Sequence, residues 1–342
     1  MNPGGRDAGW TGGRRNRALA FVVLSLCACA LSRTGPRARA EEGTGEANPF
    51  RFAVTANILV NVNPNDARAA VRVWTQLVAK DRGIRVDPEP YILDDVDAVI
   101  RRMGEGQLDA VMLTLPEYRR LSRHQELCDF HVPVQGGRTH VQYLVLARRD
   151  GGVEALNQLK GKRLGSYENP RNCMAVTWLD LVLSKEGQPP VASFFGARSH
   201  QKKLSAAVLP LFFRQLDTCV VDRLGFETLV ELNPQVGKQL GAVLTSPEFV
   251  PMVFCMRVGY PATIRKQLVE TLKTLHESEA GRQVLTVLQF ERFRPVEPDA
   301  LRGSLALLEE HDRLASEAGE RLEAASQASA SAAVIGGEAR HP

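Results

Sequence analysis

Short apolar runs alternate with stretches of helical periodicity over most of the chain, and no other sequence feature restricts its fold as strongly. Residues 50–54 carry an apolar side chain at every second position, and residues 71–83 then carry apolar side chains at helical spacing. We predict strands at 50–54, 84–86, 110–113, 141–147, 162–166, 218–221 and 240–244, and helices at 71–83, 96–104, 172–186, 204–212, 226–232 and after Pro261. Because helices connect successive strands, the sequence predicts an α/β protein with mostly parallel sheets.

The alternation falls into two halves followed by a return segment. This arrangement predicts two lobes, each a mostly parallel sheet flanked by helices, joined by two hinge crossings near residues 142–147 and 247–254. We therefore place the first part of lobe 1 at 48–145, lobe 2 at 146–246 and the return to lobe 1 at 247–297.

The C-terminal region has a different composition. Residues 298–328 form a polar pattern with Leu301, Leu305, Leu308 and Leu314 on one stripe, which predicts a helix packed on the outside of a lobe or on a partner. Residues 329–342 are rich in Ala, Ser and Gly, and we expect a disordered tail there.

The first 40 residues have the features of a signal peptide. Arginines precede an apolar run over residues 18–31, which is too short to span a membrane, and Ala38 and Ala40 place small side chains before a cleavage site. Cys29 lies in a degenerate lipobox, so lipid anchoring at this cysteine is an alternative to simple cleavage. We expect an exported, periplasmic protein.

The charge of the chain depends on this segment. The whole chain has 43 Lys and Arg against 39 Asp and Glu, but residues 1–40 contain seven arginines and one aspartate. The remainder therefore has 36 basic and 38 acidic residues. A nearly neutral chain has no general basic field for a nucleic-acid backbone, so nucleic-acid binding is disfavoured.

Four cysteines follow the signal segment, and export would place them in an oxidising compartment. Cys128, Cys173, Cys219 and Cys255 allow three pairings, and the sequence does not choose among them. Each lies in or beside an apolar stretch, where a small buried thiol is the commonest role.

Several segments together resemble one protein family. Residues 106–118 (GQLDAVMLTLPEY), 159–166 (LKGKRLGS), 194–200 (FFGARSH) and 244–251 (LTSPEFVP) are similar, in order and spacing, to segments of periplasmic solute-binding proteins of ABC importers. The resemblance is to the group that binds phosphate, phosphite or phosphonate. It implies a type II periplasmic-binding fold, whose two lobes close on a small anionic ligand and present it to an importer permease in the inner membrane. We expect a monomer that needs no cofactor.

The best candidate for an anion site is the turn at residues 167–172, between a predicted strand and the following helix. Free N–H groups at a helix N-terminus attract oxyanions, so we select Tyr167, Asn169, Arg171 and Asn172. The family group carries serines and a threonine after the proline of this turn, whereas this chain has Arg171, Asn172 and Cys173. Arg171 is either a bidentate cation that replaces the missing hydroxyl donors or a solvated loop residue.

Four further residues are candidates. Thr114, at a strand end, is suited to donate a hydroxyl hydrogen bond to an oxyanion. The resemblance implies that Tyr118 faces the cleft, whereas the alternative is packing inside the lobe. It also implies that His200 contacts the ligand at the start of a helix, against a capping or surface role. Asp222 orients a ligand amine or a residue that supports the site, or else it caps the next helix.

An enzyme is disfavoured, because the histidines show no metal-binding spacing and no G-x-S-x-G motif occurs. The second function that the sequence leaves open is a periplasmic sensor that presents its ligand state to a signalling receptor.

Overall fold

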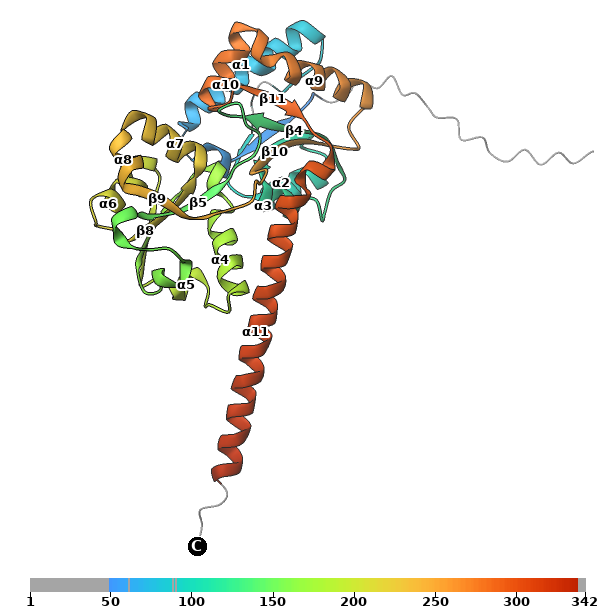
Figure 1. Ribbon diagram of the computed structural model, residues 1–342. Helices are drawn as coiled ribbons and strands as arrows, with labels where there is room; N and C mark the ends of the chain where they lie inside the picture. Colours follow the sequence, from blue (N-terminus) through green and yellow to red (C-terminus); the bar gives the residue numbers. More distant parts are fainter. Residues whose placement is uncertain (1–48, 61, 88, 90, 338–342) are drawn as a thin grey trace, which may run out of the picture. The chain divides into compact units, whose positions relative to one another are not determined.

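The computed structural model describes residues 49–60, 62–87, 89 and 91–337. The predicted signal peptide at 1–40, including Cys29, lies outside the described residues, as do residues 338–342 of the predicted tail. Two β-sheets, each covered by helices on both faces, form two lobes (Figure 1). Within the described residues, no helix is both long and apolar enough to span a membrane.

Lobe 1 is built on a six-stranded sheet with the order β11-β4-β10-β3-β1-β2. Parallel pairing joins β1 to β2 and β3, and antiparallel pairing joins β10 to β3 and β4, and β4 to β11. The strands are β1 (Phe52–Thr55), β2 (Tyr91–Leu93), β3 (Ala110–Thr114), β4 (Leu127–Val134), β10 (Met252–Arg257) and β11 (Arg292–Pro295).

Lobe 2 is built on a five-stranded sheet with the order β7-β6-β8-β5-β9. Strand β6 pairs parallel with β7 and β8, and β5 pairs antiparallel with β8 and β9. The strands are β5 (Tyr143–Arg148), β6 (Arg163–Tyr167), β7 (Ala197–Gln201), β8 (Thr218–Asp222) and β9 (Leu240–Thr245).

Helices cover both faces of each sheet. In lobe 1, Phe52 and Val54 face the core under α1, α9 and α10, while Ala53 faces the core under α2 and α3. In lobe 2, α4 and α5 cover one face, and α6, α7 and α8 cover the other. The α-helices are α1 (Pro64–Arg82), α2 (Val96–Gly104), α3 (Leu115–Leu121), α4 (Ala175–Lys185), α5 (Val191–Phe194), α6 (Leu204–Phe212), α7 (Arg223–Leu232), α8 (Pro234–Gln239), α9 (Ala262–Thr274), α10 (Glu279–Val287) and α11 (Arg302–Gly337). The 3₁₀ helices are η1 (Ala56–Leu59), η2 (Arg149–Gly151), η3 (Leu156–Leu159), η4 (Pro170–Asn172), η5 (Leu275–Glu277) and η6 (Pro298–Leu301).

The predicted two-lobed α/β class is confirmed, but the sheets are mixed rather than mostly parallel. The chain changes sheets between β4 and β5, over residues 135–142, and between β9 and β10, over residues 246–251. The strands on either side of these crossings run antiparallel to their neighbours. Tyr143–Arg148 therefore belongs to lobe 2, and the first crossing ends at residue 142, where it was expected to begin.

Five strand assignments also differ from the prediction. Residues 84–86 contribute only an isolated bridge from Val86 to Phe50, and the paired strand is β2. Strands β4, β7, β10 and β11 were not predicted. Four of the five residues of β7 are polar, and the strand lies at a sheet edge, so it lacks the apolar alternation that marks the others.

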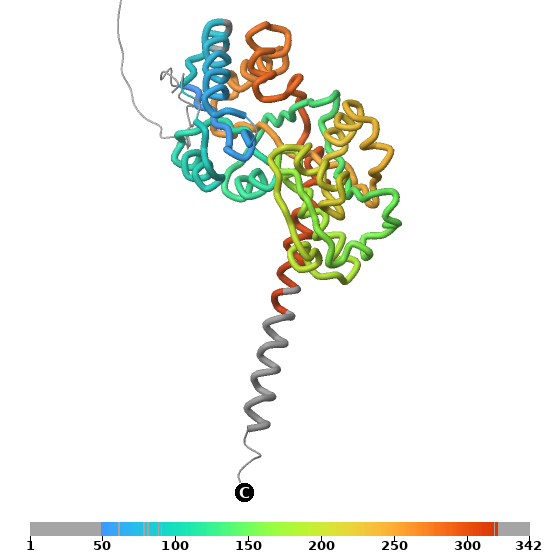
Figure 2. The backbone as a smooth tube through the Cα atoms, turned by 90° about the vertical axis from the view of Figure 1, so that its left-hand side faces the viewer, coloured from blue at the N-terminus to red at the C-terminus, as the bar shows by residue number. Residues whose placement is uncertain are grey.

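The last helix, α11, extends past the predicted end at residue 328, and its backbone is helical to Gly337. Its first turns lie beside α3 of lobe 1 and α4 of lobe 2 (Figures 1 and 2). Leu301, Leu307 and Leu308 are buried, with Leu305 and Leu314 packed against the same core.

Candidate functional site

A cleft of about 400 Å³ lies between the two lobes. Lobe 1 contributes η1 and the junction of β3 with α3. Lobe 2 contributes the ends of β6 and β7, a residue of β8, and the turn that leads into α4. The lining residues are Asn57, Val60, Thr114, Pro116, Glu117, Ser166, Tyr167, Glu168, Asn169, Pro170, Asn172, Cys173, Ala175, Val176, His200 and Val220.

A buried carboxylate organises the lobe 1 wall of the cleft. Glu117, 6% exposed, accepts hydrogen bonds from the hydroxyl of Thr55 (2.9 Å) and from Nδ2 of Asn57 (2.9 Å). It also accepts from the backbone N–H (2.9 Å) and the hydroxyl (2.7 Å) of Thr114. Four donors therefore converge on one carboxylate, which fixes the start of α3 against the end of β3 and β1.

The turn before α4 forms much of the lobe 2 wall. Oδ1 of Asn169 accepts from the backbone N–H of Asn172 (2.9 Å) and from its side-chain Nδ2 (3.3 Å), so the two asparagines hold the turn closed. The first intrahelical bond of α4 runs from the N–H of Trp178 to the carbonyl of Met174. The preceding N–H groups lack intrahelical partners, and Ala175 and Val176 line the cleft. This wall therefore offers the positive end of a helix to a ligand.

A serine and a histidine lie side by side next to this turn. Ser166 and His200 are register partners on β6 and β7, and the Ser166 hydroxyl lies 2.7 Å from Nδ1 of His200. Oε1 of Glu168 is 3.5 Å from the same ring nitrogen. Both neighbours approach Nδ1, so this is not the relay of a hydrolase, in which the serine and the acid contact different ring nitrogens. The arrangement holds the imidazole at the cleft.

Behind the turn, Arg171 is paired internally. Its side chain, 11% exposed, lies 3.4 Å from Asp222 Oδ1 through Nε and donates through Nη1 to Oε1 of Gln135 (3.0 Å). Asp222 also accepts from the backbone N–H of Gly225 (3.0 Å), at the start of α7, and from Nδ2 of Asn172 (3.2 Å). The guanidinium is thus neutralised by Asp222 and does not line the cleft.

The sequence-predicted site residues divide into two groups. Five of them line the cleft: Thr114, Tyr167, Asn169, Asn172 and His200. The Thr114 hydroxyl, however, donates to Glu117, and His200 lies on a strand rather than at the start of a helix. Tyr118 does not line it. This ring is buried and packs edge-on against Phe130, with centroids 5.8 Å apart, and burial raises its pKa. Arg171 and Asp222 form the pair behind the turn.

The prediction missed four polar residues that line the cleft. They are Asn57, Glu117, Ser166 and Glu168. One could have been found, because Thr114 and Glu117 have the spacing of a capping box, which brings the carboxylate back to the strand end. Asn57, Ser166 and Glu168 reach the cleft only through the pairing of β1, β6 and β7, and the local sequence does not indicate this pairing.

All four cysteines among the described residues are free thiols. Burial raises the pKa of Cys173 to about 12 and that of Cys128 to about 11, and it also raises the pKa of Cys219 and Cys255. The Cys173 thiol donates to the carbonyl of Pro251, in the second crossing, at 3.2 Å. These thiols are poor nucleophiles, because nucleophilicity requires the thiolate.

The cleft is polar without being basic. The residues that line it include two glutamates and one histidine but neither lysine nor arginine. Across residues 49–337, apart from positions 61, 88 and 90, no group of three or more His, Cys, Asp or Glu side chains is placed to hold a metal ion. The arrangement is suited to hold a small solute by hydrogen bonds and a helix end.

The sequence matches the family described as the phosphonate-type periplasmic substrate-binding protein of ABC transporters over residues 58–301. The chain belongs to this family. No curated protein sequence matches it.

Solved structures with the same fold have low sequence identity to the chain. A binding-protein component of an ABC phosphonate transporter from Pseudomonas aeruginosa is 17% identical, with a TM-score of 0.55 over 85% of this chain and 98% of that one. PhnD1 from Prochlorococcus marinus, in complex with methylphosphonate, is 12% identical, with a TM-score of 0.55 over 77% and 98%. A protein from Xanthomonas citri bound to chloride, XAC2383, is 16% identical, with a TM-score of 0.57 over 78% and 99%. At these identities the likeness establishes the fold alone, that of type II periplasmic binding proteins.

Proposed function

We propose that the protein captures a small oxyanion of the phosphonate class in the interlobe cleft and delivers it to an ABC importer permease. The observation that carries this proposal is the lobe 2 wall, where the start of α4, Ser166 and His200 meet at one place in the cleft. Backbone N–H groups, a hydroxyl and an imidazole are hydrogen-bond donors that suit an oxyanion without requiring a full positive charge.

The two walls differ in character, and this difference restricts the ligand further. Lobe 2 offers donors beside the half-exposed carboxylate of Glu168, which lies against His200, whereas lobe 1 presents the buried carboxylate of Glu117. A dianion that filled the cleft would lie against this carboxylate. We therefore propose a ligand with its oxyanion toward lobe 2 and a hydrogen-bond donor or cationic group toward lobe 1.

Transport requires that the bound and free states differ in shape. Each lobe supplies part of the cleft, so a ligand that contacts both parts stabilises the closed arrangement. The permease would then bind the closed form preferentially, and no chemical change of the ligand is needed. Export of the protein by residues 1–40 would place it in the periplasm, where such a permease is accessible.

A thermal-shift screen tests the ligand class. The protein without residues 1–40 is heated with methylphosphonate, 2-aminoethylphosphonate, phosphite, phosphate, sulfate and small carboxylates. A ligand at a hundredfold excess over Kd stabilises the folded state by about 2.7 kcal/mol, which raises Tm measurably. We expect phosphonates to give the largest shift, and the absence of any shift across the panel would refute the proposal.

Variants of the lobe 2 wall then locate the ligand. We expect His200→Ala and Ser166→Ala each to weaken binding of the best ligand by about tenfold, since each removes about one hydrogen bond to a charged group. Arg198→Ala is the matched control, because Arg198 lies exposed on the same strand but outside the cleft lining. Wild-type affinity in both cleft variants would exclude this wall as the anion site.

A further inference from the structure

The first turns of α11, residues 302–317, contact both lobes and the hinge. The helix follows β11 and η6 and therefore starts from lobe 1. Close to its start, the hydroxyl of Ser304 accepts a hydrogen bond from the backbone N–H of Val250 (2.8 Å), which lies in the second crossing. Ser304 is 1% exposed, so this bond is shielded from water. We call residues 302–317 the bridging segment.

Apolar packing attaches the bridging segment to both lobes. Leu307 and Leu308 belong to one continuous cluster of buried residues that includes Leu121 of α3 in lobe 1 and Trp178 of α4 in lobe 2. A displacement of one lobe relative to the other would therefore alter the packing around the bridging segment.

A row of polar groups on the bridging segment also connects the lobes. Arg119 of α3 forms an ion pair with Asp312, and this contact lowers the pKa of that carboxyl. Next to it, His311 lies with Nδ1 3.5 Å from Asp312 and with Nε2 3.7 Å from Asp180 of α4. The row runs Arg119, Asp312, His311, Asp180, from lobe 1 through the helix to lobe 2.

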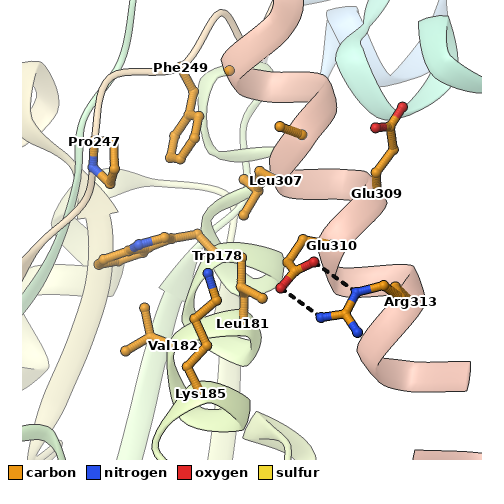
Figure 3. Close-up of a pocket in the computed structure, with 12 residues that line it drawn as sticks. Trp178, Leu181, Val182, Lys185, Pro247, Phe249, Leu307, Glu309, Glu310 and Arg313 are labelled. Atoms are coloured by element: carbon orange, nitrogen blue, oxygen red, sulfur yellow. Dashed lines mark hydrogen bonds and ion pairs between the residues drawn. The ribbon is translucent and has the colours of Figure 1, made fainter. Parts of the chain in front are cut away.

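The packing between α4 and the bridging segment is incomplete, and two pockets lie along it. A cavity of about 750 Å³ separates α4 from the bridging segment beside the second crossing, and Pro247, Phe249, Trp178 and Leu307 line it (Figure 3). Close-packed interfaces resist small shifts, whereas a cavity of this size leaves room for α4 to move relative to the helix.

The cavity wall is linked to the ligand cleft. Phe249 stacks on Tyr143, with ring centroids 5.9 Å apart and planes 25° apart. The Tyr143 hydroxyl donates to the backbone carbonyl of Arg171 (3.0 Å), in the turn that forms the lobe 2 wall. A rotation at the second crossing is therefore transmitted by direct contacts to the residues around the ligand.

We propose that the bridging segment is a third connection between the lobes, which stabilises their described arrangement and opposes opening of the cleft. The proposal rests on the proposed function only where it concerns ligand affinity. In this proposal the cavity gives α4 room to move. Arg119 is the lobe 1 end of the connection, and Asp180 is its lobe 2 end.

The test breaks each end of the polar row. Arg119→Ala removes the lobe 1 end, and Asp180→Asn removes the lobe 2 end. Small-angle X-ray scattering of the ligand-free variants should show a larger radius of gyration than the wild type. Titration calorimetry with the ligand found in the screen should show a Kd raised about two- to fivefold. Because either change interrupts the same row, the double variant should resemble each single variant rather than add their effects.

Two controls separate this role from general destabilisation. Arg302→Ala removes an exposed ion pair to Asp299 that lies outside both the polar row and the cavity, and deletion of residues 318–342 removes chain beyond the bridging segment. Both should match the wild type in scattering and in Kd. Unchanged scattering in the variants at both ends, or an equal change in the Arg302 control, would overturn the proposal. The scattering comparison needs no ligand, so it remains decisive if no phosphonate binds.

Discussion

Glu117 allows the ligand's charge distribution to be tested by a single substitution. In Glu117→Gln, the carboxamide oxygen can take the position of Oε2, which accepts from Thr55 and Thr114, and its NH₂ then faces Asn57. Rotation of the Asn57 amide would present its oxygen to this NH₂. The substitution therefore removes a negative charge from the cleft while the hydrogen-bond network can be re-formed.

The expected magnitude follows from the size of the cleft. A volume of about 400 Å³ corresponds to a sphere of radius about 4.6 Å, so a charge near its centre lies about 6 Å from the carboxylate. At that distance two unit charges interact by about 2.8 kcal/mol at an effective dielectric constant of about 20, and by about 0.7 kcal/mol in bulk water. These values correspond to about 100-fold and about threefold in Kd, and a cleft open to water favours a change of about tenfold.

Two ligands should respond differently to this substitution. Methylphosphonate, which has no cationic group, should bind Glu117→Gln about tenfold more tightly than the wild type. For 2-aminoethylphosphonate, the ammonium loses its attraction to Glu117, so its affinity should fall relative to that of methylphosphonate by at least the same factor. Titration calorimetry at low ionic strength measures both constants, since salt screens these interactions.

The control is Glu117→Ala, which leaves the donors of Thr55, Asn57 and Thr114 without their acceptor. Each unsatisfied buried donor costs about 1–3 kcal/mol, so this variant should be less stable than Glu117→Gln in urea unfolding. Equal changes of the two ligand affinities in Glu117→Gln would refute the argument, because they would mean that the carboxylate acts only on the fold.

Three further predictions concern the scaffold. Asp109 is fully buried between Arg51 (3.1 Å) and Arg257 (2.8 Å), so Asp109→Ala should lower the free energy of unfolding by about 3–5 kcal/mol in urea titration, and a loss below about 1 kcal/mol would contradict the pairing. His131 is buried, and its Nδ1–H donates to the carbonyl of Asp129 (2.8 Å), while its Nε2 has no partner in the part of the chain that the structure describes. Burial lowers the pKa of His131, so the unfolded chain binds the proton more readily. Stability should therefore fall as the pH drops below about 6.5, by up to about 1.4 kcal/mol per pH unit, and His131→Asn should weaken this dependence in unfolding curves at pH 7.5 and 5.5. The protein without residues 1–40 should show four titratable thiols in denaturant without reductant and almost none when native, whereas fewer than four in denaturant would indicate a disulfide.

Elements with strong local signals could be predicted from the sequence. Strand β3, strand β8 and helix α2 combine apolar periodicity with clear ends, and the structure places them close to the predicted bounds. Strand β7 could not be predicted in this way, because its stability comes from pairing with β6 rather than from burial of its own side chains. The sequence also did not indicate which sheet contains β5, because an apolar run is compatible with a strand in either lobe.

The candidate site shows the same limit. The turn at 167–172 was found because a strand, a proline and a helix follow one another in the sequence. The pairing of Arg171 with Asp222 was not predicted, because Asp222 lies on another strand and meets Arg171 only when β6 and β8 pair. Asp222 was expected to orient a ligand amine or a supporting residue, or to cap the following helix, and in the structure it caps α7 and pairs with Arg171.

This internal pair changes how the cleft can select its ligand. Arg171 was a candidate to replace the hydroxyl donors that this turn lacks, but a guanidinium neutralised by Asp222 adds no net charge to the site. Under the proposed function, the cleft therefore binds its oxyanion through directed donors: the α4 N–H groups, Ser166 and His200. Directed donors discriminate by the number and angle of ligand oxygens, whereas a free cation attracts any anion. The substitution of arginine, asparagine and cysteine for the family's hydroxyls is therefore compatible with selective binding, because the arginine holds the turn from behind while the backbone and its neighbours face the ligand.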